Sequence, residues 1–424
     1  MLGNKVAKNS LWLISGKVIQ MLVSLIIGLI TTRYLGPSNY GLLSYATAYT
    51  TFFASLCTLG INSVLVKELI EHPDENGAIL GSSIIMRVAS SLLSAVAILG
   101  IVSIVDKNEP LTITVVALCS LGMIFQVFDI FNYWFQSKLM SKVTAKVSLI
   151  AYVVVALYKV VLLMLGKDVA FFAFATALDY ICIGVLLFFF YKKHGGDRLR
   201  CSIPVCKRIL SQSCYFIIPG LMVAIYSQTD RLMLKQYFSE TTVGYYSTAV
   251  TICGLWVFVL SAIVDSFYPT IMEASKSNDE NEFERKNKLL YAIVFYISIF
   301  VSTFITLLAK PIIYILYGSA YLPGVNALRI ITWYTAFSYL GVARDAWIVC
   351  KKRQKYLIWI YVSAAIANVV LNILLIPIWG ASGAALASLA AQIITTFVVP
   401  FFIKPLRRNS MLMLEAIFFK GIKK

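Results

Sequence analysis

The residues best suited to chemistry in this sequence are charged side chains that lie inside long apolar stretches. The cations are Lys17, Arg87, Lys159, Arg231, Arg329 and Arg344, and the carboxylates are Asp129, Asp179, Asp230 and Asp265. A charge at mid-bilayer costs at least about 2.5–3.5 kcal/mol on insertion scales, so such residues usually face a wet interior and mark a transport path. Several cations with few unpaired acids favour an anionic ligand, because arginine offers paired donors to phosphate.

Depth separates two of these cations from the rest. Lys17 lies about seven residues into the first apolar stretch and Arg87 about nine into the third, roughly 10 to 14 Å along each helix axis. Snorkelling to the interface is difficult from that depth, so both are candidates for lining a cavity.

The other four cations lie nearer the ends of their stretches, where a long side chain can return its charge to water. Arg231 can pair with its neighbour Asp230, and Arg344 with Asp345. The aspartates are too short to snorkel far. They therefore pair with cations, cap helices or form sites for a coupling H⁺ or Na⁺, and the sequence leaves these alternatives open.

Catalytic groupings have little support. The two histidines, His72 and His194, fall in predicted cytoplasmic loops, and no Ser-His-Asp, Cys-His or acidic metal cluster can be assembled from the sequence. No glycine-rich phosphate loop ending in Lys-Ser or Lys-Thr is present. The chain is therefore predicted not to be an enzyme and to hold no metal or cofactor, with H⁺ or Na⁺ coupling as a possible energy source.

The elements that must position these charges are apolar helices. The chain has 424 residues, of which 59% are hydrophobic and 13% charged, and a mean hydropathy of +0.81. A spanning helix needs roughly 20 mostly apolar residues, and the sequence contains twelve such runs, which predict an all-α polytopic membrane protein. The runs are 10–32, 41–65, 78–105, 111–136, 143–165, 168–191, 209–235, 243–271, 289–317, 325–350, 355–378 and 380–404.

The net charge of +17 follows membrane topology. With the N-terminus placed in the cytoplasm, 26 of the 37 Lys and Arg fall in inward-facing loops and tails. The outward side holds five: Arg33, Lys107, Lys167, Lys235 and Lys310. This asymmetry fits the positive-inside rule. It predicts a multi-pass protein of the bacterial cytoplasmic (inner) membrane with both termini cytoplasmic, and it makes a nucleic-acid partner unnecessary.

A repeat divides the runs into two halves. RYLGPSNYGLLSYATA (33–48) is echoed 203 residues later by KQYFSETTVGYYSTAV (235–250), with Gly41 falling on Gly244 where the chain is expected to turn back into the membrane. Six spans per half make the repeats parallel, which predicts two pseudo-symmetric six-helix lobes around a central cavity. The predicted parts are an N-terminal lobe 1–191, a cytoplasmic linker 192–208, a C-terminal lobe 209–404 and a basic cytoplasmic tail 405–424.

Four stretches carry a family resemblance. They are the repeat at 33–48, FNYWFQSKLMSKVTAK (131–146), YFIIPGLMVAIYSQTDRLMLKQYFSETTVGYYSTAV (215–250) and NVVLNILLIPIWGASGAALASLAAQ (368–392). Together they resemble the Wzx-type polysaccharide flippases of the multidrug/oligosaccharidyl-lipid/polysaccharide exporter superfamily, in order and over nearly the whole chain.

The resemblance implies a substrate and its partners. It implies a flippase that moves undecaprenyl-diphosphate-linked oligosaccharide repeat units from the inner to the outer leaflet, for O-antigen, lipopolysaccharide or capsule biosynthesis. A polysaccharide polymerase and a chain-length regulator are then possible partners, beside membrane lipid. The diphosphate would meet Lys17, Arg87 and the other four cations, and sugar contacts are expected from Asn132, Gln228, Asn368 and Asn372.

Two other transport functions are weighed against this one. A peptidoglycan lipid-precursor flippase usually has two more spans than the twelve predicted here. A multidrug cation antiporter of the same fold is disfavoured by the cationic interior. A membrane-embedded polymerase or ligase would need a large catalytic outer loop, whereas the longest predicted outer connection has only about ten residues.

Overall fold

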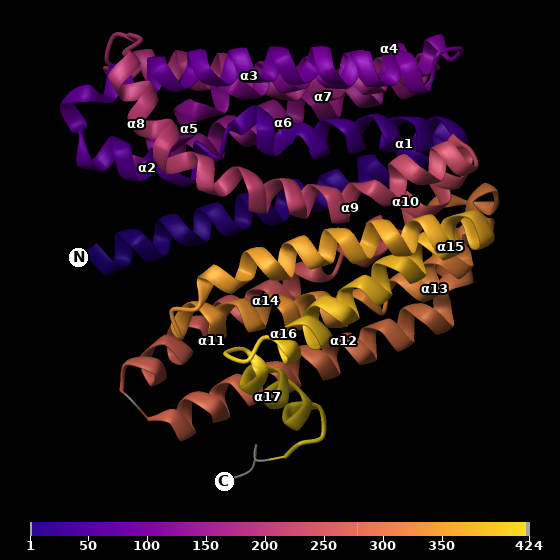
Figure 1. Ribbon diagram of the computed structural model, residues 1–424. Helices are drawn as coiled ribbons and strands as arrows, with labels where there is room; N and C mark the ends of the chain where they lie inside the picture. The colour runs from indigo at the N-terminus through magenta and orange to yellow at the C-terminus, as the bar shows by residue number, and fades with distance from the viewer. Residues whose placement is uncertain (1, 278, 421–424) are drawn as a thin grey trace. The chain divides into compact units, whose positions relative to one another are not determined.

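The computed structural model describes residues 2–277 and 279–420, with side chains described from Val23 onward. Over these residues the chain is helical and forms no strand (Figure 1). In the part described, nine helical segments are long and apolar enough to cross a membrane, by length and composition. The predicted class, an all-α polytopic membrane protein, is confirmed.

Two of the nine segments each contain two predicted spans. In Val23–Glu71 the helix α1 (Leu2–Thr58) is broken at Gly36, whose φ is 69°, just before Pro37. In Gln354–Phe402 the helix α15 (Leu357–Ile393) is broken at Gly380, whose φ is 52°. Glycine tolerates a positive φ that interrupts a helix. The predicted span 325–350 forms two shorter helices, α13 (Val325–Ile331) and α14 (Tyr334–Cys350), and the exact count of twelve stays a prediction.

The sequence repeat marks equivalent breaks in the two halves. Gly36 interrupts α1, and 203 residues later Ser239 caps α10 (Glu240–Gly254) by accepting a hydrogen bond from the Thr242 amide at 3.4 Å. Each break precedes the repeated glycine, Gly41 or Gly244, by five residues. The repeated glycines therefore lie within helices, one turn beyond the point where the chain turns.

Residue contacts divide the chain into two compact units, 1–224 and 225–424. The helix α9 (Ile217–Tyr237) crosses this division. The lobe boundaries predicted from the sequence, at 191 and 209, stay predictions.

The first unit is a bundle of helices around an aromatic core. Phe131, Trp134 and Tyr191 are packed together with aliphatic side chains of α2 and α3. Besides α1, its helices are α2 (Asn62–Glu71), α3 (Asn76–Val105), α4 (Pro110–Phe125), α5 (Ile130–Ser137), α6 (Ser141–Met164), α7 (Val169–Lys193) and α8 (Ile203–Ser213), with a 3-10 turn at Gln126–Asp129. Figure 1 shows α3, α4 and α7 running side by side, as their contacts require.

The connection between α7 and α8 lies along α3. The Arg200 amide donates to the Gly77 carbonyl at 3.0 Å, and the Ser202 amide donates to Ser82 Oγ at 2.9 Å. A Cβ added at Gly81 would lie 2.3 Å from the Arg200 carbonyl oxygen. Only a glycine allows the connection to approach the helix this closely.

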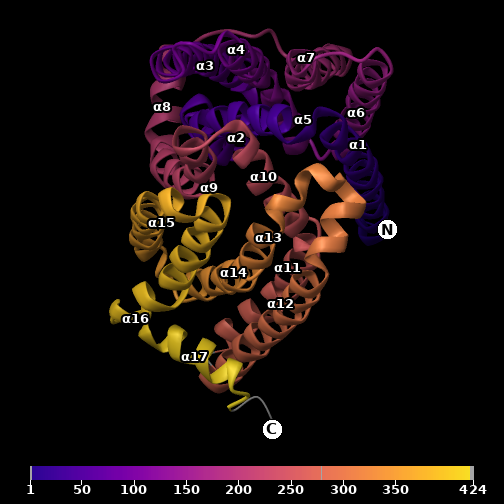
Figure 2. The same cartoon turned by 90° about the vertical axis from the view of Figure 1, so that its right-hand side faces the viewer.

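The second unit is built on the long helix α12 (Glu280–Tyr317). Its core joins Tyr291 of α12, Trp347 of α14 and Leu412 of α17 (Arg407–Ile417). The helix α17 lies against α12 in both views (Figure 2). The remaining helices are α10 (Glu240–Gly254), α11 (Val257–Lys276), α16 (Val399–Phe402) and α17 (Arg407–Ile417), with a π-helical turn at Ile394–Val398.

Candidate functional site

Arg87 of α3 is a buried cation inside the first unit, with 1% of its surface exposed. Its Nη1 donates to Asn62 Oδ1 at 3.2 Å and its Nη2 donates to the Gln126 carbonyl at 3.3 Å. The Nε atom is buried and has no partner in the described part of the chain. Because a guanidinium carries five N–H donors, this side chain keeps hydrogen-bonding capacity for an anionic group.

The helix face around Arg87 is small and polar. Ser83, Ser91 and Ser94 are buried four residues before, four after and seven after Arg87, so they share its face. Ser83 Oγ also has no partner among the described atoms. Asp129 lies near enough for its charge to act on Arg87, but no salt bridge joins Arg87 to a described carboxylate.

Four other predicted residues of the first unit are half-buried: Asp129, Asn132, Lys159 and Asp179. Asp129 ends the 3-10 turn next to Asn132 of α5. Lys159 of α6 and Asp179 of α7 lie close enough for their charges to interact, but no salt bridge joins them in the described part of the chain. Lys17 lies outside the residues whose side chains are described, so its role stays a prediction.

The second unit contains a fully hydrogen-bonded buried carboxylate, Asp230 of α9, which is 2% exposed. Its Oδ1 accepts hydrogen bonds from Asn372 Nδ2 at 2.5 Å and Asn368 Nδ2 at 3.2 Å. Its Oδ2 accepts from Ser388 Oγ at 2.6 Å and from the Tyr246 hydroxyl. We call these five residues the Asp230 cluster. All four partners are neutral donors.

The break in α15 brings the Asp230 cluster together. Asn368 and Asn372 precede Gly380 and Ser388 follows it, so the helix must turn back for both sides to meet one carboxylate. The two arms pack closely, because a Cβ added at Gly383 would lie 2.2 Å from the Leu375 carbonyl oxygen.

The expected pairing of Arg231 with Asp230 is wrong. Arg231 is half-buried and donates through Nε to Ser247 Oγ at 3.2 Å and through Nη1 to Gln228 Oε1 at 2.8 Å. Successive helix residues point about 100° apart, so Asp230 and Arg231 meet different surroundings. Gln228, a predicted sugar contact, lies beside this arginine.

The predicted pair of Arg344 and Asp345 is confirmed, with Nη2 at 2.8 Å from Oδ1. Arg344 also donates to the Thr395 carbonyl at 2.8 Å, so this buried guanidinium is largely occupied. Arg329 is exposed and donates to Asn326 Oδ1 at 3.4 Å, and Asp265 is exposed on α11.

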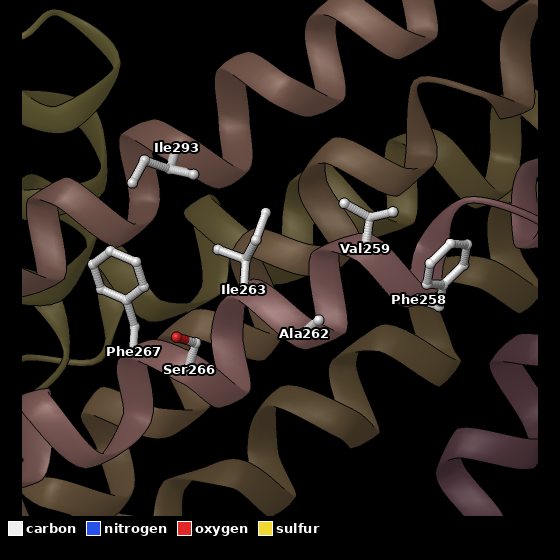
Figure 3. A pocket seen from close by; sticks show the side chains of 7 residues that line it. All are labelled: Phe258, Val259, Ala262, Ile263, Ser266, Phe267 and Ile293. Carbon is white, nitrogen blue, oxygen red and sulfur yellow. The ribbon is translucent and has the colours of Figure 1, made fainter. Parts of the chain in front are cut away.

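An apolar cavity of about 450 Å³ lies between α11 and α12. Figure 3 shows its lining, in which Ile293 comes from α12 and the rest from α11: Phe258, Val259, Ala262, Ile263, Ser266 and Phe267. The α11 residues recur in pairs every four positions, so they form one helix face. A site with this lining suits a hydrocarbon chain rather than a charged group.

Potential metal ligands gather at one place in the described chain. Ligand atoms of Glu68, Glu71 and His72 lie within 4.8 Å of one another. Glu68 already accepts hydrogen bonds from Arg208 at 3.0 Å and Gln212 at 2.6 Å. Its carboxylate is therefore used in holding α8 against α2.

Sequence reasoning missed Tyr246 and Ser388 of the Asp230 cluster and Asn62 beside Arg87. Tyr246 and Ser388 lie 16 and 158 residues from Asp230. Both occur in the stretches that carry the family resemblance, and that was the signal available. A tyrosine or a serine within an apolar helix does not by itself indicate a functional site. Their contact with Asp230 becomes visible only in the folded structure.

Comparison with known proteins agrees with this fold. Over 411 residues the chain is 22% identical to the capsular polysaccharide biosynthesis protein CapF of Staphylococcus aureus, covering 94% of this chain and 99% of CapF. The lipid II flippase MurJ in an inward closed conformation is similar with a TM-score of 0.71 and 15% identity, over 96% of this chain and 90% of MurJ.

A multidrug resistance MATE family transporter of the MOP superfamily in its inward-facing conformation is also similar. The TM-score is 0.68 at 16% identity, over 95% of this chain and 99% of that one. The fold expected from the sequence motifs is thus confirmed. Residues 6–275, more than half of the chain, match the model of one family, and the chain therefore belongs to the polysaccharide biosynthesis protein family.

Proposed function

We propose that the chain is a flippase for polysaccharide precursors, moving undecaprenyl-diphosphate-linked oligosaccharide repeat units from the inner to the outer leaflet of the bacterial cytoplasmic membrane. The observation that carries the proposal is Arg87 in a member of a polysaccharide biosynthesis family. Among the described residues, this buried guanidinium has no partner for Nε and forms no salt bridge. Such a group is suited to a diphosphate, whose oxygens accept charge-assisted hydrogen bonds.

The chemistry of the substrate explains why a protein is needed. An oligosaccharide carried through hydrocarbon would lose many hydrogen bonds, each costing several kcal/mol if left unsatisfied. The isoprenoid chain needs no such shelter, and the apolar cavity between α11 and α12 offers it a surface. Movement of negative charge outward in an inside-negative cell is favourable by about 2.3 kcal/mol per charge per 100 mV.

Asp230 is our candidate for coupling to H⁺ or Na⁺. A buried carboxylate without a paired cation is costly, and Asp230 is surrounded by neutral donors. Binding of one H⁺ or one Na⁺ would remove the uncompensated charge. Since Asn368 and Asn372 donate to Asp230, we assign them to this site. Asn132 and Gln228 remain the candidates for sugar contacts.

The test uses the full chain in proteoliposomes that carry a lipid-diphosphate-linked oligosaccharide. Transfer to the other leaflet is measured by access of an added glycosidase. Arg87→Ala should slow transfer about tenfold or more, since hydrogen bonds to charged groups contribute about 1.5–3 kcal/mol, and Arg87→Lys should retain part of the rate. Arg285→Ala removes an exposed cation from α12 and serves as the matched control.

Three results would contradict the proposal. Equal transfer by the Arg87 and Arg285 variants would remove the diphosphate site. Transfer of a peptidoglycan precursor in place of the oligosaccharide lipid would favour the first alternative. Export of organic cations with no lipid transfer would favour an antiporter.

A further inference from the structure

The helix α17 has two apolar faces, only one of which is covered. Its inner face buries Leu412, Met413 and Ala416. Its outer face carries Met411, Leu414 and Phe418, which are 38%, 42% and 70% exposed. These three outer residues are spaced three and four apart, so they form one stripe along the helix.

Polar contacts hold the inner side of α17 on α12. Arg408 forms salt bridges with Glu284 of α12 and with Glu415, and Lys288 of α12 forms a further one with Glu415. Asn409 Nδ2 donates to the Tyr291 hydroxyl at 2.6 Å. The outer stripe is therefore presented in a fixed orientation.

The far end of α17 is attached deeper along α12. The Tyr296 hydroxyl donates to the Ile417 carbonyl at 2.6 Å, and the Tyr296 ring stacks on Phe419 at 4.7 Å between centroids. Tyr296 lies about seven residues inside the predicted span 289–317, or about 10 Å from its edge at the helical rise. An interfacial helix buries its apolar face about 5–10 Å into the boundary of headgroups and acyl chains.

Exposed basic residues flank the stripe. Lys404 and Arg407 lie at its beginning and Lys420 at its end, and Arg407 stands over the Phe401 ring at 5.2 Å. The acidic Glu415 is occupied by Arg408 and Lys288. An apolar stripe bordered by cations matches an anionic lipid surface.

We propose that the outer face of α17 binds anionic phospholipid of the cytoplasmic leaflet, with Met411, Leu414 and Phe418 among the acyl chains and Lys404, Arg407 and Lys420 at the headgroups. A second copy of the chain is a poorer occupant, because it would bring the same cations together. The proposal is independent of what the protein transports.

The test is hydrogen–deuterium exchange of the full chain in nanodiscs that each hold one copy. Discs of phosphatidylcholine alone are compared with discs that also contain phosphatidylglycerol. Segment 404–420 should exchange more slowly with phosphatidylglycerol present. One basic residue near an anionic surface contributes about fivefold in affinity, so Lys404→Gln/Arg407→Gln should weaken lipid binding about thirtyfold and abolish the difference.

The matched control is Lys138→Gln/Lys142→Gln, which removes two exposed cations from another predicted cytoplasmic segment. This control variant should keep the lipid-dependent difference in exchange. A thermal unfolding measurement checks that each variant is folded. Leu414→Ser should raise exchange of the segment in both kinds of disc. Equal exchange of the unmodified protein in both discs, or a difference that survives in Lys404→Gln/Arg407→Gln, would overturn the proposal. Protection that is insensitive to headgroup and grows with protein concentration in detergent would identify a second copy and also overturn it.

Discussion

Replacement of Asp230 by asparagine should separate ion coupling from stability. In Asp230→Asn the remaining oxygen can still accept from Asn368 and Asn372, while the new amide takes the place of Oδ2. The Ser388 and Tyr246 hydroxyls can rotate to accept, since a hydroxyl both donates and accepts. Tyr246 can then donate to Ser388 Oγ, 3.3 Å away. The variant resembles the protonated, neutral form of the cluster.

The magnitudes for two substitutions differ clearly. Asp230→Leu leaves three buried donors without an acceptor, because Tyr246 can turn to Ser388 Oγ, and this costs about 1–3 kcal/mol each or about 3–9 kcal/mol together. That approaches the whole stability of an ordinary domain, about 5–15 kcal/mol. Asp230→Asn leaves only the Ser388 hydroxyl in need of a new acceptor and removes a buried charge, so its stability should change by no more than about 1–3 kcal/mol.

Two measurements decide the matter. Thermal unfolding in nanodiscs should place Asp230→Asn near the unmodified protein and Asp230→Leu far below it. Transfer in proteoliposomes with an imposed H⁺ or Na⁺ gradient should lose its gradient dependence in Asp230→Asn but not in Glu273→Gln, a control at an exposed acid of α11. Full gradient dependence in Asp230→Asn would refute the coupling role. Equal destabilisation in Asp230→Asn and Asp230→Leu would refute the idea that the Ser388 and Tyr246 hydroxyls rotate to accept hydrogen bonds.

Three further predictions concern other parts of the chain. Ala262→Trp should fill the cavity of about 450 Å³ between α11 and α12 and slow lipid transfer without changing the unfolding temperature, and an unchanged rate would exclude this cavity as a lipid surface. Gly81→Ala should destabilise the first unit by about 1–3 kcal/mol through overpacking, whereas Gly100→Ala on the same helix, with nothing within 4 Å, should not; similar unfolding curves would disprove the close approach. Partial burial raises the pKa of Glu415, but the Lys288 hydrogen bond and the Arg408 charge outweigh this effect and lower that pKa below 4.5. Attachment of α17 should therefore persist above pH 4.5 and weaken as the pH falls further. Hydrogen–deuterium exchange of segment 407–417 measures this loss, and in Glu415→Gln its acid-dependent part should disappear.

Hydropathy and charge asymmetry were enough to predict the membrane helices, because apolar runs of about 20 residues are typical of helices that cross a bilayer. The break between the predicted spans ending at 378 and starting at 380 coincides with Gly380, whose positive φ needs glycine. The connection between the predicted spans ending at 32 and starting at 41 contains the break at Gly36, while the repeated Gly41 lies within the helix that follows. Local glycine and proline signals thus located kinks to within about a turn.

The sequence predicted an ion-pair partner correctly only where the two residues are adjacent in the chain and their side chains reach one another. Arg344 and Asp345 can meet because a long arginine side chain reaches back to the adjacent carboxylate. Arg231 and Asp230 look equivalent in sequence, yet Asp230 already has four donors from α10 and α15. Which neighbour a carboxylate takes is decided by distant helices, and a single sequence does not reveal that.

The bend at Gly380 folds α15 into a helical hairpin whose two arms meet at the Asp230 carboxylate. Both arms hold the same carboxylate, Asn368 and Asn372 from one side and Ser388 from the other. Neutralising that charge would change the hydrogen bonds of both arms at once, so the proposed binding of one proton or sodium ion would act on both arms of the folded helix.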